Sequence, residues 1–234
     1  MNNFLLIETA TDTCSVAVSC EDRILAGKML NEPKSQASKL VPLIDECLKE
    51  AGIRISECTA VSVSKGPGSY TGLRVGVSTA KGLCFGKNLP LIGIDTLEII
   101  AREAARISGI HGEYAIIPMI DARRMEVYTA TYDVNFRMIQ ETRPVILDEA
   151  SFAEEIASHD RILFAGNGTP KFRECLAGKY GDRCIFIDCP PTAMAMAAAT
   201  SEAWNRKRLE DVAYFEPFYL KDFIAGISKK SVLP

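Results

Sequence analysis

Four glycines gather in one short segment that could hold a phosphate group. Within the segment SKGPGSYTGLRVG they are Gly66, Gly68, Gly72 and Gly76. Such loops bind phosphate when backbone N–H groups at a helix start point at the anion. A P-loop requires GxxxxGK followed by Ser or Thr, and neither Gly66 nor Gly68 has a glycine five residues further on. The dinucleotide pattern GxGxxG also fails, because its last position is Thr71.

The same glycines also suit close packing of a helix. Gly72, Gly76 and Ala80 recur every four residues, so they form a ridge of small residues on one helix face. Each glycine inside a helix costs about 1 kcal/mol relative to alanine, and close approach of another backbone would offset that cost. The neighbour could be the chain's own helix at residues 35–51 or another subunit, and the sequence leaves both open.

Two further turns could contribute to a nucleotide site. Glu8-Thr9-Ala10-Thr11 follows the first strand, where actin-like ATPases have an Asp-x-Gly turn, and Ala10 has less backbone freedom than glycine. The turn at residues 166–170 follows a strand and opens a helix, so it could host an anion or serve only as a tight connection. The candidate nucleotide-binding residues are Glu8, Thr9, Gly166 and Gly168.

The densest group of charges also has two interpretations. It consists of Asp121, Arg123, Arg124 and Glu126. These side chains could line a cleft, or they could belong to a solvated hairpin turn. The sequence does not decide between the two.

No catalytic constellation or metal site is indicated. The only two histidines, His111 and His159, are far apart in sequence. No Ser-His-Asp or Cys-His arrangement stands out. We therefore assign no catalytic residue, no metal ligand and no cofactor.

Composition points to a soluble cytoplasmic protein. The chain has 234 residues with a formal net charge of −3, which argues against holding a long nucleic acid by itself. The basic run at residues 206–208 reads as a helix end. The eight cysteines form no CxxC pair, and no segment has the apolar length of a signal peptide or a membrane span. We expect reduced thiols in the cytoplasm.

Strand and helix patterns alternate twice in the same order. In each half we predict three strands, a helix, a strand, a helix, a strand and a helix. In the first half the predicted helices span 35–51, 71–86 and 96–108, the last opened by a capping box at Asp95. In the second half they span 149–158, 170–177 and 192–208.

This order predicts an α/β protein with duplicated βββαβαβα lobes, the topology of the actin-like ATPase superfamily. We place an N-terminal lobe at residues 1–110 and a C-terminal lobe at residues 111–234. The aromatic tail at residues 215–223 is expected to pack back on the body of the protein, because exposed aromatic surface is costly.

The segment SKGPGSYTGLRVGVSTAKGL resembles the signature of the TsaB family of the tRNA threonylcarbamoyladenosine machinery. LLIETATDTCSVAV is similar to the family's opening hairpin, PLIGIDTLEIIA to its next strand and helix, MIDARRMEVYTATY to the first hairpin of its second lobe, and FEPFYLKD to its closing segment. The resemblance runs in order over nearly the whole chain. It implies the two-lobed actin-like fold.

The resemblance also implies partners. Family members are non-catalytic platforms that bind and activate a homologous catalytic subunit, TsaD, and a small ATPase, TsaE, joins the complex. They meet tRNA only through that complex, and they self-associate through the same surface. An alternative from the residues is an actin-like ATPase or transferase that uses the interlobe cleft.

The family's first two helices contact the partner, which places the interface on the predicted helices 35–51 and 71–86. The implied interface residues are Leu40, Leu43, Ile44, Cys47, Gly66, Pro67, Gly68, Ser69, Tyr70, Thr71, Gly72, Arg74, Val75, Gly76, Thr79, Ala80 and Leu83. The catalytic relatives hold a metal with a His-x-x-x-His pair on the first helix, and the matching segment at residues 34–39 has no histidine. That departure fits a non-catalytic role, and it removes a histidine that many TsaB relatives keep there.

Overall fold

The first lobe is built on a five-stranded mixed sheet. The computed structural model describes residues 1–32, 36–176 and 178–220. The strands lie in the order β3-β2-β1-β4-β5, with β1 antiparallel to β2 and parallel to β4. The central strands are apolar and buried on both faces, so they require cover on both sides. Their bounds are β1 (Asn3–Glu8), β2 (Cys14–Cys20), β3 (Arg23–Leu30), β4 (Ala60–Gly66) and β5 (Leu91–Asp95).

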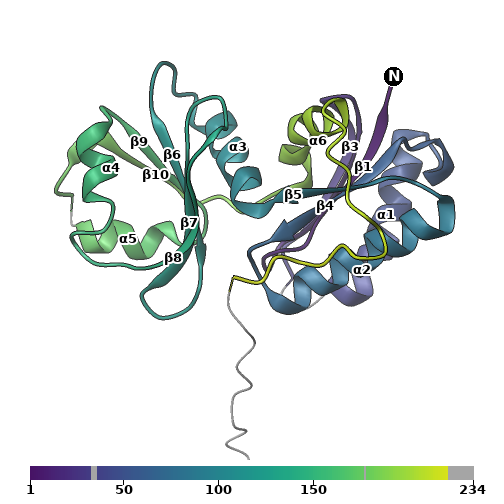
Figure 1. Cartoon of the computed structure of the whole chain (residues 1–234), viewed down its shortest axis with the longest axis horizontal. Helices are drawn as coiled ribbons and strands as arrows, with labels where there is room; N and C mark the ends of the chain where they lie inside the picture. Colours follow the sequence, from purple (N-terminus) through teal and green to yellow (C-terminus); the bar gives the residue numbers. More distant parts are fainter. Residues whose placement is uncertain (33–35, 177, 221–234) are drawn as a thin grey trace, which may run out of the picture.

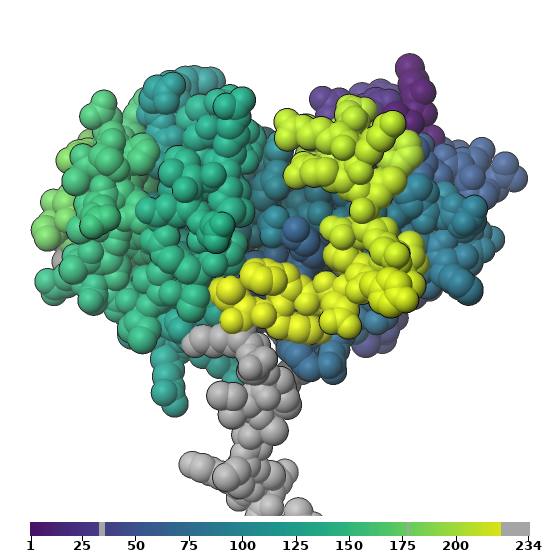
Figure 2. Space-filling model, in the orientation of Figure 1, coloured from purple at the N-terminus to yellow at the C-terminus, as the bar shows by residue number. Residues whose placement is uncertain are grey.

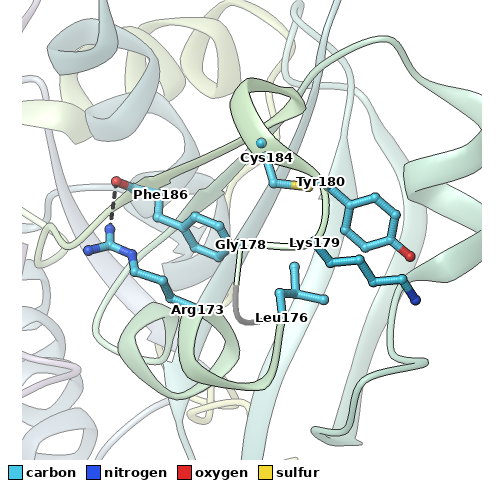
Figure 3. Close-up of a pocket in the computed structure, with 8 residues that line it drawn as sticks. Arg173, Leu176, Gly178, Lys179, Tyr180, Cys184 and Phe186 are labelled. Atoms are coloured by element: carbon cyan, nitrogen blue, oxygen red, sulfur yellow. Dashed lines mark hydrogen bonds between the residues drawn. The ribbon is translucent and has the colours of Figure 1, made fainter.

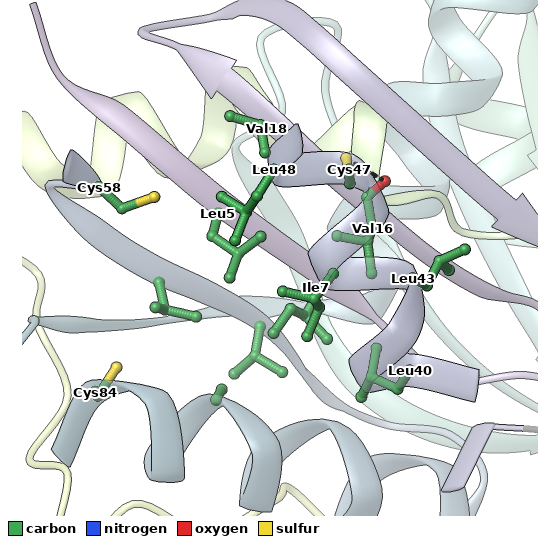
Figure 4. Packing of buried hydrophobic residues seen from close by; sticks show 14 of the residues in the cluster. Leu5, Ile7, Val16, Val18, Leu40, Leu43, Cys47, Leu48, Cys58 and Cys84 are labelled. Carbon is green, nitrogen blue, oxygen red and sulfur yellow. Dashed lines mark hydrogen bonds between the residues drawn. The ribbon is translucent and has the colours of Figure 1, made fainter. Parts of the chain in front are cut away.

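Two helices, α1 (Gln36–Ala51) and α2 (Tyr70–Lys87), cover one face of this sheet. Helix α1 buries Leu40, Ile44 and Cys47 in the core of the first lobe. Figure 4 shows Leu40 and Cys47 on the side of α1 that faces the sheet. Helix α2 starts where the Ser69 hydroxyl accepts a hydrogen bond from the Gly72 N–H at 3.3 Å. A serine N-cap of this kind satisfies one of the donors at a helix start.

The second lobe repeats the arrangement. Its sheet has the order β10-β9-β6-β7-β8, and α4 and α5 cover one face through a cluster of phenylalanines that includes Phe164 and Phe172. The helices at residues 149–158 and 192–208 are shorter than predicted. The bounds are β6 (Ala115–Asp121), β7 (Glu126–Tyr132), β8 (Met138–Ile146), α4 (Ala153–Ser158), β9 (Ile162–Ala165), α5 (Thr169–Leu176), β10 (Cys184–Ile187) and α6 (Ala197–Asn205). Of the predicted segments, residues 34–35, 177 and 221–234 lie outside the described residues.

The last helix of each repeat packs on the other lobe. Helix α3 (Thr96–Ser108) buries Leu97, Ile100 and Ala104 mainly against the second sheet. The turn Ala193–Met196 and helix α6 cover the open face of the first sheet. The predicted boundary near residue 110 therefore separates the two sheets but not the helices that cover them. Figure 1 shows α3 between the lobes.

The capping box predicted at the start of α3 is wrong. Asp95 is the N-cap residue, but its side chain makes no capping hydrogen bond. Its carboxylate instead faces the Lys65 ammonium at 3.3 Å. The Asp95 carboxylate therefore pairs with Lys65 at the end of β4, and it does not cap the backbone N–H groups of α3 as the sequence pattern predicted.

Residues 209–220 form a strap across the first lobe, which is coloured yellow in Figure 2. The Glu210 N–H donates to the Leu91 carbonyl at 2.9 Å, and Phe215 is buried in the core of the first lobe. The Lys81 ammonium of α2 donates to the carbonyls of Ala213 and Phe215 at 3.2 and 2.8 Å. The strap therefore packs along the side of α2 that carries Lys81.

Candidate functional site

The turn after β1 is buried and lies under α2. Glu8 and Thr9 have no exposed surface. The Glu8 Oε1 atom accepts a hydrogen bond from the Ala10 N–H at 2.7 Å, while its buried Oε2 atom has no hydrogen-bond partner among the described residues. Burial raises the pKa of the Glu8 carboxyl to about 8, and the hydrogen bonds from Ala10, Ser64 and Thr9 only partly oppose that rise. Glu8 is therefore mainly protonated at neutral pH.

The turn after β1 packs against Gly72 and Gly76 of α2. A Cβ atom on Gly72 would lie 2.1 Å from the Thr9 carbonyl oxygen, and one on Gly76 would lie 2.2 Å from the Thr9 hydroxyl oxygen. Thr9 Oγ1 donates to the Gly72 carbonyl at 2.8 Å. The Ser69 N–H donates to the Ala10 carbonyl at 2.6 Å. These contacts lock the turn against the start of α2.

The sequence left two neighbours open for the ridge, the chain's own helix at residues 35–51 or another subunit. At Gly72 and Gly76 the neighbour is instead the turn after β1, because a Cβ on Gly72 would overlap the Thr9 backbone and one on Gly76 would overlap the Thr9 side chain. Ala80 is buried in the core of the first lobe together with residues of α1. The predicted interface residues that are buried in the chain itself cannot face a partner in this structure. They are Leu40, Leu43, Ile44, Cys47, Gly66, Pro67, Gly72, Gly76 and Ala80.

The space beside the two glycines predicted to bind a nucleotide is also filled by other residues of the chain. A Cβ atom on Gly166 would lie 2.4 Å from the Met119 carbonyl oxygen, and one on Gly168 would lie 2.8 Å from the Val127 side chain. With Glu8 and Thr9 beneath α2, all four candidate residues serve internal packing. The interpretation of residues 166–170 as a tight strand-to-helix turn therefore fits the structure better than an anion site.

Gly66 is held by the strap. Its φ of 117° lies in the range that favours glycine, and a Cβ there would lie 2.4 Å from the Phe218 carbonyl oxygen. The Phe218 N–H donates to the Lys65 carbonyl at 2.7 Å. The buried glycines of the signature segment thus shape the monomer, since Gly66 and Gly72 accommodate a backbone of the same chain and Gly76 accommodates the Thr9 side chain.

The remaining predicted residues lie on α2 or in the two positions before it. Ser69, Thr71 and Arg74 are exposed, and the half-buried members are Gly68, Tyr70, Val75, Thr79 and Leu83. The Arg74 guanidinium lies 4.0 Å from the centre of the Tyr70 ring, and its Nε donates to the Tyr219 hydroxyl at 3.3 Å. The start of α2 is therefore tied to the strap through this aromatic cluster.

Two exposed apolar side chains on α1 and α2 were missed from the sequence. Val41 on α1 is 62% exposed and Phe85 on α2 is 88% exposed. Added Cβ atoms on Gly82 and Gly86 beside Phe85 would meet no other atom within 4 Å. The available signal was an apolar residue one position off the buried stripe of each helix. We define the outer docking face as Val41, Thr71, Val75, Gly82 and Phe85.

Two cavities among the described residues bear on a small-molecule site. One of about 90 Å³ lies near the lobe junction, and its charged lining is Lys65, Asp95, Glu98, Arg208 and Glu210. Another of about 170 Å³ lies on the second lobe between α5 and β10 (Figure 3). Both are below the roughly 300–1,000 Å³ of typical small-molecule sites.

The group of charges at residues 121–126 forms the turn between β6 and β7. The Asp121 Oδ1 atom accepts hydrogen bonds from the Lys171 ammonium and from the Arg123 N–H, each at 2.6 Å. Arg123 and Arg124 are exposed. Of the two interpretations, a hairpin turn is confirmed. No helix among the described residues has the length and apolarity to cross a bilayer.

Comparisons with known proteins agree over nearly the whole chain. The family model for "TsaD: tRNA N6-adenosine threonylcarbamoyltransferase" matches residues 33–228. The tRNA threonylcarbamoyladenosine biosynthesis protein TsaB of Escherichia coli (strain K12) is 35% identical over 228 residues, 94% of this chain and 95% of that protein. The protein of the same name from Bacillus subtilis (strain 168) is 29% identical over 221 residues, 93% of each chain.

Solved structures give the same result for the fold. YeaZ from Pseudomonas aeruginosa superposes with a TM-score of 0.80 at 26% identity, covering 94% of this chain and 100% of that one. The predicted two-lobed actin-like fold is confirmed. From the identity to curated relatives and the coverage on both sides, we conclude that the chain belongs to the TsaB family.

Proposed function

We propose that this chain is a non-catalytic subunit of the machinery that makes threonylcarbamoyladenosine in tRNA. It binds and activates a TsaD-like catalytic subunit, and a TsaE-like ATPase joins the complex. The observation that carries the proposal is the match to TsaB proteins over nearly the full length, because those proteins are named for the biosynthesis of tRNA threonylcarbamoyladenosine. The match to the TsaD family model supports a partner of the same fold.

The packing around the four candidate nucleotide-binding residues supports a non-catalytic role. Glu8 and Thr9 lie under α2, and Gly166 and Gly168 accommodate the chain's own β6 and β7. An ATPase would need those backbone groups to face a phosphate. The structure therefore offers no specific observation in favour of the alternative, an ATPase or transferase that uses the interlobe cleft.

The outer docking face is where we place the partner. Val41 and Phe85 are large apolar side chains left in solvent, although most residues of their kind in the first lobe are buried. Apolar and aromatic side chains at the centre of an interface contribute most of its binding energy. The glycines beside Phe85 leave open space in which a helix of a partner could approach closely.

The test is co-purification with a TsaD-like subunit, followed by a tRNA modification assay. Val41→Asp and Phe85→Asp should each weaken partner binding at least tenfold, because a charge would be buried at the interface without a counter-ion. Both side chains are exposed, so the fold should be retained. Modification of tRNA should fall in parallel.

Ile139→Asp is the matched control. Ile139 is 52% exposed on β8 of the second lobe, so the same change of charge is made away from the docking face. Unchanged partner affinity in folded Val41→Asp and Phe85→Asp proteins would contradict the assigned face. Sedimentation of the isolated chain would show in addition whether a second copy uses the same face.

A further inference from the structure

The turn between β6 and β7 has a backbone conformation that its side chains disfavour. Arg123 and Arg124 have φ angles of 71° and 50°. Left-handed conformations are costly for residues with a Cβ, and tight hairpin turns of this kind usually contain Asn-Gly or Asp-Gly. Non-glycine residues held in such conformations concentrate at binding sites, where the strain is retained for the sake of function.

The turn is anchored from behind. The Asp121 N–H donates to the Asn167 side-chain oxygen at 2.9 Å, and the Asp121 carboxylate receives the Lys171 ammonium and the Arg123 N–H. The Ala122 N–H donates to the Glu126 carbonyl at 3.0 Å. The turn is thus fixed to the connection between β9 and α5, and its two arginines project from a rigid base.

The two arginines are not neutralised within the described part of the chain. Asp121, two residues before Arg123, already forms an ion pair with Lys171 at 2.6 Å. No hydrogen bond or ion pair to a described residue is formed by the guanidinium of Arg123 or of Arg124. Two adjacent guanidiniums therefore remain available to an anion, and the planar guanidinium fits phosphate groups well.

We propose that Arg123 and Arg124 contact backbone phosphates of the tRNA. The inference depends on the proposed function, which supplies an RNA as the substrate of the complex. Phosphate contacts position an RNA without reading its bases. Two contacts add little affinity alone, so the site acts together with the catalytic subunit, consistent with the chain's net charge of −3.

The experiment replaces both arginines by the residues that suit the turn. Arg123→Asn with Arg124→Gly relieves the backbone strain, so the thermal midpoint should rise or stay unchanged. Binding of unmodified tRNA is measured by fluorescence anisotropy across a salt series, for the chain alone and saturated with the catalytic subunit. The slope of log K against log salt should become shallower by about 1.4–1.8, the value for two lost phosphate contacts.

Two further variants define the controls. Arg123→Lys with Arg124→Lys retains the charge and should keep most of the slope. Arg137→Asn removes one exposed arginine from the hairpin between β7 and β8, at the other end of those strands, and should leave the slope unchanged. Together they separate the effect of charge at this turn from a general change in net charge.

The outcomes distinguish this inference from the proposed function. If the complex forms and modifies tRNA while the Asn-Gly variant keeps the wild-type slope, the phosphate contact is refuted and the proposed function stands. If the variant loses affinity for the catalytic subunit with no change of slope, the turn is a protein contact and the inference is again refuted. If no complex forms, the proposed function fails, and this inference fails with it because it depends on that function.

Discussion

At the scale of single residues, Glu8 shows how burial changes the meaning of a carboxyl group. The position suggested a nucleotide ligand from the sequence, because a strand end followed by a short turn opens the actin-like fold. In the structure the side chain is enclosed beneath α2, and its carboxyl is retained in the neutral form. Its role is to hold the turn through the Ala10 N–H.

A pH dependence of stability follows from this carboxyl. The pKa of Glu8 is raised from 4.5 to about 8 by burial, so the folded chain retains a proton that the unfolded chain releases. The stabilisation is complete below pH 4.5 and is lost as pH rises toward 8. In that window the free energy of unfolding should fall by up to about 1.4 kcal/mol per pH unit from this group.

Glu8→Gln should remove this contribution. The amide oxygen can still accept from the Ala10 N–H, and the variant has no proton to lose. Urea denaturation of both proteins from pH 5 to 9 gives the comparison, and the difference between the two curves should grow with pH in favour of Gln. Parallel curves would show that the Glu8 carboxyl is already ionised in the folded chain, so that its pKa is not raised by burial.

At the scale of elements, α2 has three distinct sides. One buries the glycine ridge against the turn at residues 9–10, one is held by the strap through Lys81, and one carries the outer docking face. The lower helix propensity of glycine is therefore offset by close packing at one part of α2 and not at another. Gly72 is required by the Thr9 backbone and Gly76 by the Thr9 side chain, whereas Gly82 lies open to solvent.

Alanine substitutions should have opposite effects on the two sides. Gly72→Ala places a Cβ 2.1 Å from the Thr9 carbonyl oxygen, so the turn or the helix must move. We expect a loss of about 2 kcal/mol or more in the free energy of unfolding. Gly82→Ala meets no atom and should gain about 0.5–1 kcal/mol through helix propensity. Chemical denaturation measures both, and equal effects of the two substitutions would contradict this division of the helix.

The sequence allowed the ridge itself to be predicted but not its neighbour. Spacing of Gly72, Gly76 and Ala80 shows that a backbone comes close, because small residues repeat on one face. It carries no information on which backbone that is, since Thr9 and Ala10 have ordinary side chains and lie about sixty residues earlier. The exposed Phe85 was missed because an isolated apolar residue on a mixed helix gives no periodic signal.

At the scale of the whole molecule, the two lobes are joined because α3 packs mainly on the sheet of the second lobe and α6 packs on the sheet of the first. The order of elements could be predicted from the sequence, because each strand and helix has its own period. The crossing of α3 and α6 could not, since their buried residues suit either sheet. Arg102 of α3 marks the crossing, because its guanidinium contacts Glu98, Glu202 of α6 and the ring of Phe136.

Loss of the Arg102 guanidinium should destabilise the contact between α3 and α6. The Arg102 side chain is 8% exposed, and Arg102→Met would leave the partly buried Glu98 carboxylate without its counter-ion. We expect a loss of about 2–4 kcal/mol in the free energy of unfolding, together with faster hydrogen exchange in α6. Arg54→Met removes an exposed pair with Glu57 and should change stability by no more than about 0.5 kcal/mol. Equal effects of the two variants would refute the role of Arg102 in this contact.

The covering of the first sheet by α6 has a consequence for synthesis on the ribosome. The strands of that sheet leave the exit tunnel first, yet the helix over Phe4, Leu6 and Ile92 is made about a hundred residues later. Phe215 of the strap arrives later still. The nascent chain must therefore carry a sheet with one uncovered apolar face for nearly half of translation, and the two lobes mature together only when elongation is nearly complete.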